Sequence, residues 1–270
     1  MKTWNFAVNA YGLHIGIQLS SLDYRDSVLD RMPPGWTFDS SGCLDRVYTL
    51  YVGAGPGARH ELQVDGDLLY FHNSLDDVLR WLEADVRIYV AEKRKDLLFV
   101  HAGVVGWRGQ GIILPGRDSN GKTTLVRSLM QAGATYYSDS FAVFDRQGRV
   151  HPYSTALSAE NWNGVCGVDP LPASLIVGTM FVRGTEWMPR RLSSDCAMLV
   201  LFANAVATHP LPGNALTTLR KVCSGSIALE GPRGEAEEIA DSILSELPAL
   251  SRKERATVQI ASSSSSSSCF

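Results

Sequence analysis

Hydrophobic and polar positions change their spacing along the chain, and each change marks a predicted element. The first 95 or so residues show short alternating patterns broken by turn residues, which is typical of strands, and then a helical pattern from Ser74 to about Arg94. The far end of that helix is also compatible with a strand. We expect this region to form a smaller α+β unit, with these apolar residues near helical spacing in the helix: Val78, Leu79, Leu82, Val86 and Ile88.

The pattern changes at residue 97, where two long apolar runs follow each other. Residues 97–106 and 111–114 are joined by a short polar stretch, which predicts a hairpin. A glycine-rich segment comes next, followed by a helical pattern over residues 122–132 that stops at Gly133. Strand-like pieces are then predicted at 135–138, 141–144, 174–182 and 197–202, and helices at 214–223 and 234–247.

Composition narrows the class of protein without identifying it. A chain of 270 residues, 45% hydrophobic and 20% charged, can bury a full core as one large domain or two small ones. The net charge is −3 and the sequence has no long basic run, so we expect no nucleic-acid partner. Five scattered cysteines without a C-x-x-C pair indicate a reducing, cytoplasmic setting. No secretory signal and no apolar run of membrane-spanning length is found, so we expect no membrane partner.

The last 20 residues have a composition of their own. Residues 251–270 include seven consecutive serines, at 262–268, and too few apolar residues to pay for ordering the chain. We expect this segment to be a disordered tail. The expected organisation is therefore an N-terminal region over residues 1–95, a core over residues 96–250 and the tail over residues 251–270.

The glycine-rich segment matches the phosphate-binding pattern G-x-x-x-x-G-K-[ST] without a mismatch. Such a loop needs a strand before it and a helix after it, because backbone N–H groups and the helix N-terminus must converge on phosphate oxygens. Both flanks are predicted here. Lys122 can reach the outer phosphates, and the Thr123 hydroxyl can bind Mg²⁺. The candidate nucleotide-binding residues are Gly116, Arg117, Asp118, Ser119, Asn120, Gly121, Lys122, Thr123 and Thr124.

This loop alone does not separate a kinase from an ATPase, a GTPase or a transporter motor, so the neighbouring residues matter. Asp139 follows the helix at the end of a short predicted strand, where its carboxylate can approach either a magnesium ion or an attacking hydroxyl, or simply occupy a turn. His101 lies in an apolar run one hairpin away from the loop. A lone histidine in such a run is more often a hydrogen-bonded core or edge residue than a functional one.

The stretch from residue 97 to about 155 resembles the kinase core of the HPr kinase/phosphorylase family. The resemblance is carried by Phe99 to Val105, by Gly111 to Gly116 with the loop that follows, and by Leu129 to Asp139. It is similar in particular to the HPr-kinase-related proteins of peptide-modification clusters, including lasso-peptide kinases that phosphorylate the C-terminal serine of a precursor. The resemblance is weaker up to about residue 247 and absent before residue 95.

The resemblance implies an α/β fold with a mixed sheet, like the P-loop fold of phosphoenolpyruvate carboxykinase, preceded by the smaller α+β region. It implies ATP and Mg²⁺ as cofactors and His101, Lys122 and Asp139 as catalytic residues, with Asp139 accepting the proton of the substrate hydroxyl. The family commonly has a second acid after the aspartate, where this chain has Ser140. Glu160 is a candidate replacement metal ligand, and a solvated loop acid is its other interpretation. The glycine-rich acidic motif of the bifunctional enzymes is absent, which disfavours a reverse phosphorylase activity.

The hypothesis that follows is an ATP-dependent serine kinase whose partner is a peptide or small protein with an acceptor serine, such as a lasso-peptide precursor docked by the N-terminal region. Two alternatives remain open at this point. One is a kinase of a folded carrier protein of the HPr type or of a small molecule. The other is a non-catalytic switch that binds ATP. Members of the family are often oligomeric, so a homo-oligomer is compatible with the resemblance.

Overall fold

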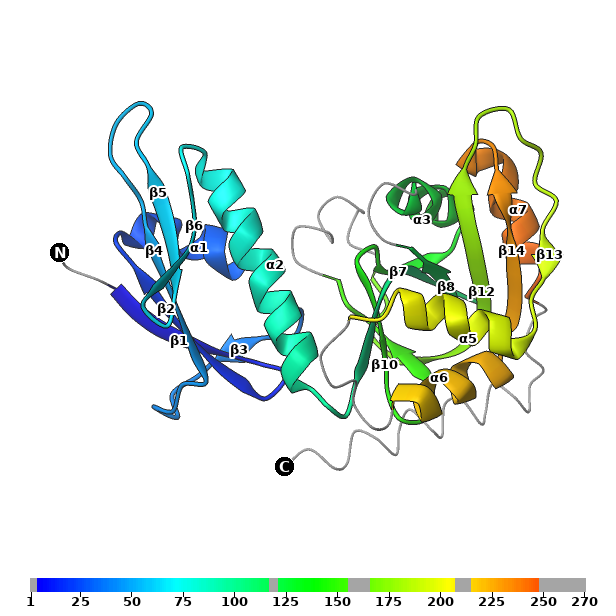
Figure 1. Ribbon diagram of the computed structural model, residues 1–270, viewed down its shortest axis with the longest axis horizontal. Coiled ribbons are helices and arrows are strands. Elements are labelled where there is room, and N and C mark those ends of the chain that lie inside the picture. Colours follow the sequence, from blue (N-terminus) through cyan, green and yellow to red (C-terminus); the bar gives the residue numbers. More distant parts are fainter. Residues whose placement is uncertain (1–3, 117–120, 155–165, 207–214, 248–270) are drawn as a thin grey trace. The chain divides into compact units, whose positions relative to one another are not determined.

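The computed structural model describes residues 4–116, 121–154, 166–206 and 215–247 of the chain. The chain divides into two compact units, with the boundary between Arg94 and Lys95, and each unit has its own β-sheet (Figure 1). Within the described ranges, no helix is both long enough and apolar enough to cross a membrane. The predicted tail at 251–270 lies outside the described residues.

The N-terminal unit is a six-stranded mixed sheet with one long helix. The strand order is β3-β1-β2-β4-β5-β6, in which only the β2–β4 pair is parallel. Its elements are β1 (Trp4–Ala10), β2 (Leu13–Leu19), the 3-10 turn η1 (Leu22–Tyr24), α1 (Arg25–Leu29), β3 (Thr37–Phe38), β4 (Arg46–Tyr51), β5 (His60–Val64), β6 (Asp67–His72) and α2 (Leu75–Lys93).

Helix α2 begins where the sequence predicts it. The Ser74 hydroxyl accepts a hydrogen bond from the Asp77 N–H at 3.3 Å, and Asp76 and Asp77 place negative charge in the first turn, where the helix dipole favours it. The apolar residues named from the sequence pack one face of the helix, except Ile88, which is exposed. The element remains helical to Lys93, so its far end is not a strand.

The C-terminal unit is built on an eight-stranded mixed sheet. Its elements are β7 (Leu98–Trp107), β8 (Gln110–Pro115), α3 (Lys122–Gln131), β9 (Thr135–Ser138), β10 (Phe141–Phe144), β11 (Arg149–His151), β12 (Leu171–Phe181), β13 (Arg190–Arg191), α5 (Ser194–Ala203), α6 (Ala215–Ser224), β14 (Ile227–Arg233) and α7 (Ala236–Ser245). The order is β11-β10-β7-β8-β12-β14-β13, with β9 paired to β7 as well. Strand β12 is parallel to β8 and β14, and the other pairs are antiparallel. The predicted α/β class, with a mixed sheet and a smaller α+β region before it, is confirmed.

Helices cover both faces of this second sheet (Figure 1). Successive residues on a strand point to opposite sides, so neighbouring residues pack against different helices. Val104 on β7 packs in the cluster that includes α5 and α6, and its neighbour Val105 packs in the cluster that includes α3 and α7. We call these sides the α5 face and the α3 face. A strand with both faces covered needs apolar residues at nearly every position, which explains why β7 and β8 appear in the sequence as continuous apolar runs.

One predicted strand is wrong: residues 197–202 belong to helix α5. The helix starts because the Ser193 hydroxyl accepts a hydrogen bond from the Cys196 N–H at 3.2 Å, and Asp195 lies in the first turn. Only Ala197 and Leu201, which are four residues apart, are buried. The run is apolar on every side, so it carries no helical periodicity to distinguish it from a buried strand.

Asp145 stabilises the hairpin between β10 and β11. Its carboxylate accepts hydrogen bonds from the backbone N–H of Gln147 and Arg149 and from the side chains of Arg149 (2.8 Å) and His151 (3.0 Å). Burial raises the pKa of Asp145, but the bonds from His151 and Arg149 outweigh burial and lower the pKa to about 2. A carboxylate with a depressed folded-state pKa stabilises the fold above its unfolded pKa and loses that effect as the pH falls through the folded value.

We therefore expect Asp145→Asn to lower the free energy of unfolding of this unit by about 2 kcal/mol at pH 7, because the negative charge is lost and an amide nitrogen in place of Oδ2 cannot accept the bonds from the Arg149 and His151 side chains. The destabilisation caused by Asp145→Asn should fall to about half by pH 3, which lies between the unfolded and folded pKa values of Asp145. Urea denaturation at the two pH values measures it. Asp241→Asn, at an exposed position on α7, is the matched control. Equal destabilisation at pH 7 and pH 3 would contradict this interpretation.

Candidate nucleotide site

The site begins where β8 delivers the chain to α3. All six residues of β8 are buried, and the Gly116 N–H that follows donates to the His101 carbonyl at 3.0 Å. Gly121 precedes α3 with φ at +71°, a conformation that favours glycine. The strand and the helix that the phosphate-binding pattern requires are thus present on either side of residues 117–120. Arg117, Asp118, Ser119 and Asn120, and the candidate metal ligand Glu160, lie outside the described residues.

Helix α3 presents its N-terminus without a side-chain cap. Gly121 offers no capping side chain, and the first turn contains no acidic residue. The Gly121 carbonyl accepts the first intrahelical bond, from the Leu125 N–H at 3.1 Å. The N–H groups before that point have no partner within the helix, and together with the helix dipole they favour an anion. Lys122 is half-buried in this first turn, and Thr123 and Thr124 are exposed beside it.

His101 lies on the strand next to this loop. Residues two apart on a strand share a face. Val105 of β7 packs in the α3-face cluster, and a Cβ added at Gly103 would lie 2.7 Å from the Val126 side chain of α3. His101 therefore lies on the α3 face. Its half-buried ring packs against Phe141, with 4.9 Å between the ring centroids. The backbone N–H of His101 donates to the Asn204 carbonyl at the end of α5 (2.7 Å).

Asp139 occupies a turn between β9 and β10, held by buried neighbours. The hydroxyl of Tyr136, a fully buried residue of the α3-face cluster, donates to Asp139 Oδ1 at 2.9 Å. The Ser140 hydroxyl lies 3.4 Å from the same oxygen. The buried Ser138 hydroxyl accepts the N–H groups of Ser140 (3.1 Å) and Phe141 (3.0 Å), which fixes the turn itself. The aspartate is thus a positioned carboxylate.

Strand β7 brings these parts together, because it has the phosphate-loop strand on one side and the Asp139 turn on the other. Ala102 pairs with Pro115 of β8, and its N–H donates to the Ser140 carbonyl at 3.2 Å. Neighbouring strands lie about 4.8 Å apart, so the backbones of Gly116 and Ser140 are roughly 10 Å apart across β7.

The residues present fit ATP and Mg²⁺. An uncapped helix N-terminus with a lysine in its first turn suits a polyphosphate. Magnesium keeps several waters and is usually held by one or two protein groups together with the substrate's phosphates. The exposed Thr123 hydroxyl is such a group. The described residues contain no cluster of three or more His, Cys, Asp or Glu side chains that would bind a metal without the nucleotide.

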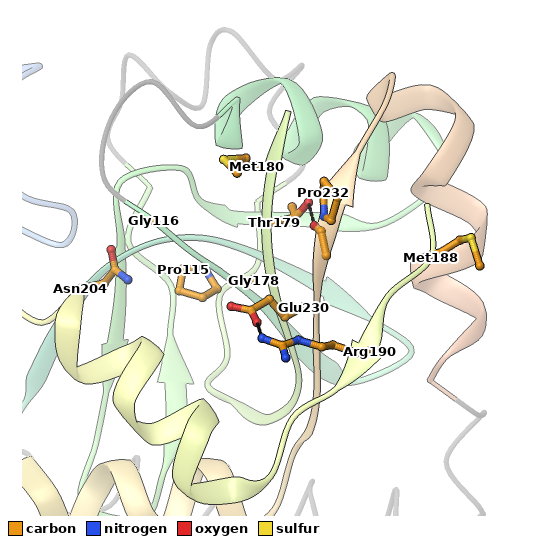
Figure 2. Close-up of a pocket in the computed structure, with 11 residues that line it drawn as sticks. Pro115, Gly116, Gly178, Thr179, Met180, Met188, Arg190, Asn204, Glu230 and Pro232 are labelled. Carbon is orange, nitrogen blue, oxygen red and sulfur yellow. Dashed lines mark hydrogen bonds and ion pairs between the residues drawn. The ribbon is translucent and has the colours of Figure 1, made fainter. Parts of the chain in front are cut away.

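A cavity of about 520 Å³ opens at the end of β8, β12 and β14, but on the α5 face (Figure 2). Its walls include Pro115, Met180 and Asn204, and the ion pair between Arg190 and Glu230 (2.6 Å) crosses one side. Of the predicted site residues that the structure describes, it touches Gly116 alone. The cavity therefore adjoins the start of the phosphate loop from the face opposite to α3 and does not contain His101, Lys122 or Asp139.

Sequence reasoning missed two residues that position the site. Tyr136 precedes Asp139 by three positions. A tyrosine this close to the aspartate in the sequence was the available signal that its hydroxyl could bind the carboxylate. Arg233, at the end of β14, donates from Nη2 to the Gly121 carbonyl at 2.9 Å. Strand β14 itself was not predicted, because Gly231, Pro232 and Gly234 resemble a turn. Pro232 is tolerated because β13 pairs only with Leu229 and Glu230 and leaves that end of β14 uncovered on one side.

Comparisons with known proteins give little that bears on this site. No protein-family model matches the chain, and no curated protein matches it. Among solved structures, the HPr(Ser) kinase/phosphatase from Coxiella burnetii is similar with a TM-score of 0.32 and 10% sequence identity, over 60% of this chain and 98% of that one. That likeness is too weak to assign a fold family or an activity, so the functional conclusions below rest on the chain's own residues.

Proposed function

We propose that this protein is an ATP-dependent kinase that transfers the γ-phosphoryl group to a hydroxyl group of its substrate. One observation carries the proposal: the phosphate-binding pattern at the β8–α3 junction and the positioned carboxylate of Asp139 flank the same strand. Binding of nucleotide alone would not need a carboxylate fixed at that place. A phosphoryl transfer does, because the attacking hydroxyl must lose its proton next to the phosphate.

The reaction would proceed by in-line displacement at the γ-phosphorus. The acceptor oxygen forms a bond to phosphorus while the bond from phosphorus to the oxygen that bridges the β- and γ-phosphates breaks, and ADP leaves with that electron pair. Asp139 takes the hydroxyl proton. Lys122 and the N–H groups at the start of α3 stabilise the negative charge on the transferred group. Bound Mg²⁺ would supply further neutralisation of the outer phosphates, with Thr123 as a ligand.

His101 would act at the edge of this arrangement. It lies on the α3 face of β7, between the strand of the phosphate loop and the strand that leads from Asp139. From there an imidazole can orient the acceptor or share the charge of the phosphoryl group. Phe141 supports the ring from the neighbouring strand. We therefore assign His101 an orienting role and Asp139 the role of base.

The choice of acceptor rests on the resemblance of residues 97–155 to the HPr kinase/phosphorylase family and its lasso-peptide kinases. The proposed acceptor is a serine hydroxyl of a peptide, specifically the C-terminal serine of a lasso-peptide precursor, and the N-terminal unit would dock the peptide. A carrier protein of the HPr type is the alternative acceptor. A switch that binds ATP without transferring phosphate is the third candidate. The one observation that favours it is Ser140, which stands where the related family commonly has a second acid.

The first test is phosphoryl transfer to matched acceptors. Peptides identical except for a C-terminal serine or alanine, and separately HPr, are incubated with the protein, ATP and Mg²⁺ and examined by mass spectrometry. We expect phosphate on the serine peptide alone. Phosphate on HPr alone would select the carrier-protein alternative. Tight ATP binding with no phosphate on any acceptor would support the switch and contradict the peptide kinase.

Asp139→Asn tests the base. Replacing the carboxylate with an amide removes the proton acceptor, so we expect the transfer rate to fall by at least about 100-fold while the Kd for ATP changes by less than about threefold. Asp241→Asn, on the exposed side of α7, should leave both quantities unchanged. Full activity of Asp139→Asn would rule out this residue as the base.

Tyr136→Phe tests whether the position of that carboxylate matters. Loss of the hydroxyl removes a bond to a charged group worth about 1.5 kcal/mol, so we expect kcat to fall about tenfold and the KM for ATP to stay within about twofold. Tyr137→Phe is the matched control, because the Tyr137 hydroxyl donates instead to the Asp169 carbonyl at 2.9 Å. Equal losses of kcat in the two variants would indicate a general packing effect.

A further inference from the structure

Arg233 is a cation buried inside the C-terminal unit. Only 1% of the residue is exposed, which is rare for an arginine. It ends β14 on the α3 face, and its guanidinium lies 5.7 Å from the centre of the Phe181 ring at the end of β12. Phe181 and Arg233 are paired residues on these two parallel strands. The cation is therefore fixed at the carboxyl end of the sheet, beside the start of α3.

The contacts of this guanidinium do not neutralise its charge. Nη2 donates to the Gly121 carbonyl and Nη1 to the Gly234 carbonyl, both at 2.9 Å, and the buried Nε has no hydrogen-bond partner among the residues that the structure describes. Within the part of the chain that the structure describes, Arg233 forms no ion pair with a carboxylate. Burial lowers the pKa of Arg233, and the charges of Glu235 and Glu237 oppose that effect from the start of α7.

Such an arrangement is costly without an anion. A buried charge loses its hydration, and nearby opposite charge must compensate. Here the guanidinium is next to Gly121, the residue before the first turn of α3. The positive charge of Arg233 and the positive end of the helix dipole therefore adjoin each other. A ligand with several negative charges at that helix end would compensate both. The close fit supports a fixed placement, because a Cβ on Gly121 would lie 2.6 Å from Arg233 Nη2.

We propose that Arg233 is a second phosphate-recognising cation of the nucleotide site, in addition to Lys122. It holds the Gly121 carbonyl in place and adds a fixed positive charge beside the start of α3, which attracts the polyphosphate of a nucleotide. The ligand class is a nucleoside triphosphate, and affinity should rise with the number of phosphates. This inference rests on the proposed nucleotide site but does not depend on which acceptor is phosphorylated, or on whether phosphate is transferred at all.

A purely structural clamp between α3 and the turn before α7 would make the same two hydrogen bonds. The two roles differ in how they depend on ligand charge. A clamp affects the folded protein with or without nucleotide, and affects all nucleosides alike. A phosphate-recognising cation acts mainly on the charged part of the ligand, and its removal relieves the cost of burying a cation when no ligand is bound.

The test compares Arg233→Met, which removes the charge at similar volume, with Arg233→Lys, which keeps it. Calorimetric Kd values are measured for ATP, ADP and adenosine, together with melting temperatures without nucleotide. For Arg233→Met we expect ATP binding to weaken at least about tenfold, ADP binding to weaken less, and adenosine binding to change by less than about twofold. Arg233→Lys keeps the charge but loses the fork of two donors, so its loss of ATP affinity should be smaller than that of Arg233→Met. Arg220→Met, on the exposed side of α6, is the matched control and should change nothing.

The proposal is overturned if Arg233→Met weakens ATP and adenosine equally, if its ATP affinity equals that of the wild type, or if the wild type binds no ATP. Should Arg233→Met not fold, Arg233→Gln, which removes the charge but keeps hydrogen-bond donors, takes its place with the same three ligands. A ratio of ATP to adenosine affinity unchanged from the wild type in that variant, together with a lowered melting temperature, would then identify a structural clamp. A wild type that binds ATP but phosphorylates nothing would refute the kinase proposal and leave the role of Arg233 standing.

Discussion

The candidate site depends on the backbone pairing of β7 with a strand on each side. On one side, the His101 carbonyl accepts the Gly116 N–H, which fixes where the phosphate loop begins. On the other side, the Ala102 N–H donates to the Ser140 carbonyl, which fixes the turn that carries Asp139. These two bonds come from adjacent residues of one buried strand. The distance between the phosphate-binding end and the carboxylate is therefore set by the sheet rather than by flexible side chains.

Electrostatics divides the site in a way that suits phosphoryl transfer. The positive features gather at the start of α3, where the helix dipole, Lys122 and the buried Arg233 adjoin each other. The negative feature, Asp139, lies across β7 and is held by the Tyr136 hydroxyl. A polyphosphate would be drawn to the first group, and a hydroxyl would be deprotonated by the second. Among the described residues of this arrangement, the cavity on the α5 face touches Gly116 alone.

The sequence predicted the parts of the site that depend on local pattern. The hairpin of β7 and β8, the helix from Lys122 and the stop at Gly133 follow from apolar runs and glycines that act within a few residues. Helix α5 was predicted as a strand because its apolar residues surround the helix and leave no period to read. Strand β14 was missed because Gly231 and Pro232 are turn residues in most contexts, and only the short length of β13 makes them acceptable there.

Long-range contacts explain the rest of what could not be predicted. Arg233 is 112 positions from Gly121 in the sequence, and no local pattern relates them. The pairing of Asp139 with Tyr136 is local, but its value comes from the burial of Tyr136 against α3 and α7, which depends on the whole sheet. Chemistry-bearing residues within a motif can thus be read from the sequence. The residues that hold them in place belong to distant strands and require the fold.

We propose that residues 116–124 bind the phosphates of a nucleotide, and isothermal titration of ATP and Mg²⁺ into the wild type and Lys122→Ala measures this binding. We expect saturable binding to the wild type and at least about tenfold weaker binding to the variant, because the point charge in the first turn of α3 is lost. Equal affinity in the two proteins would show that Lys122 does not contact the nucleotide, and would rule out a phosphate site at the start of α3.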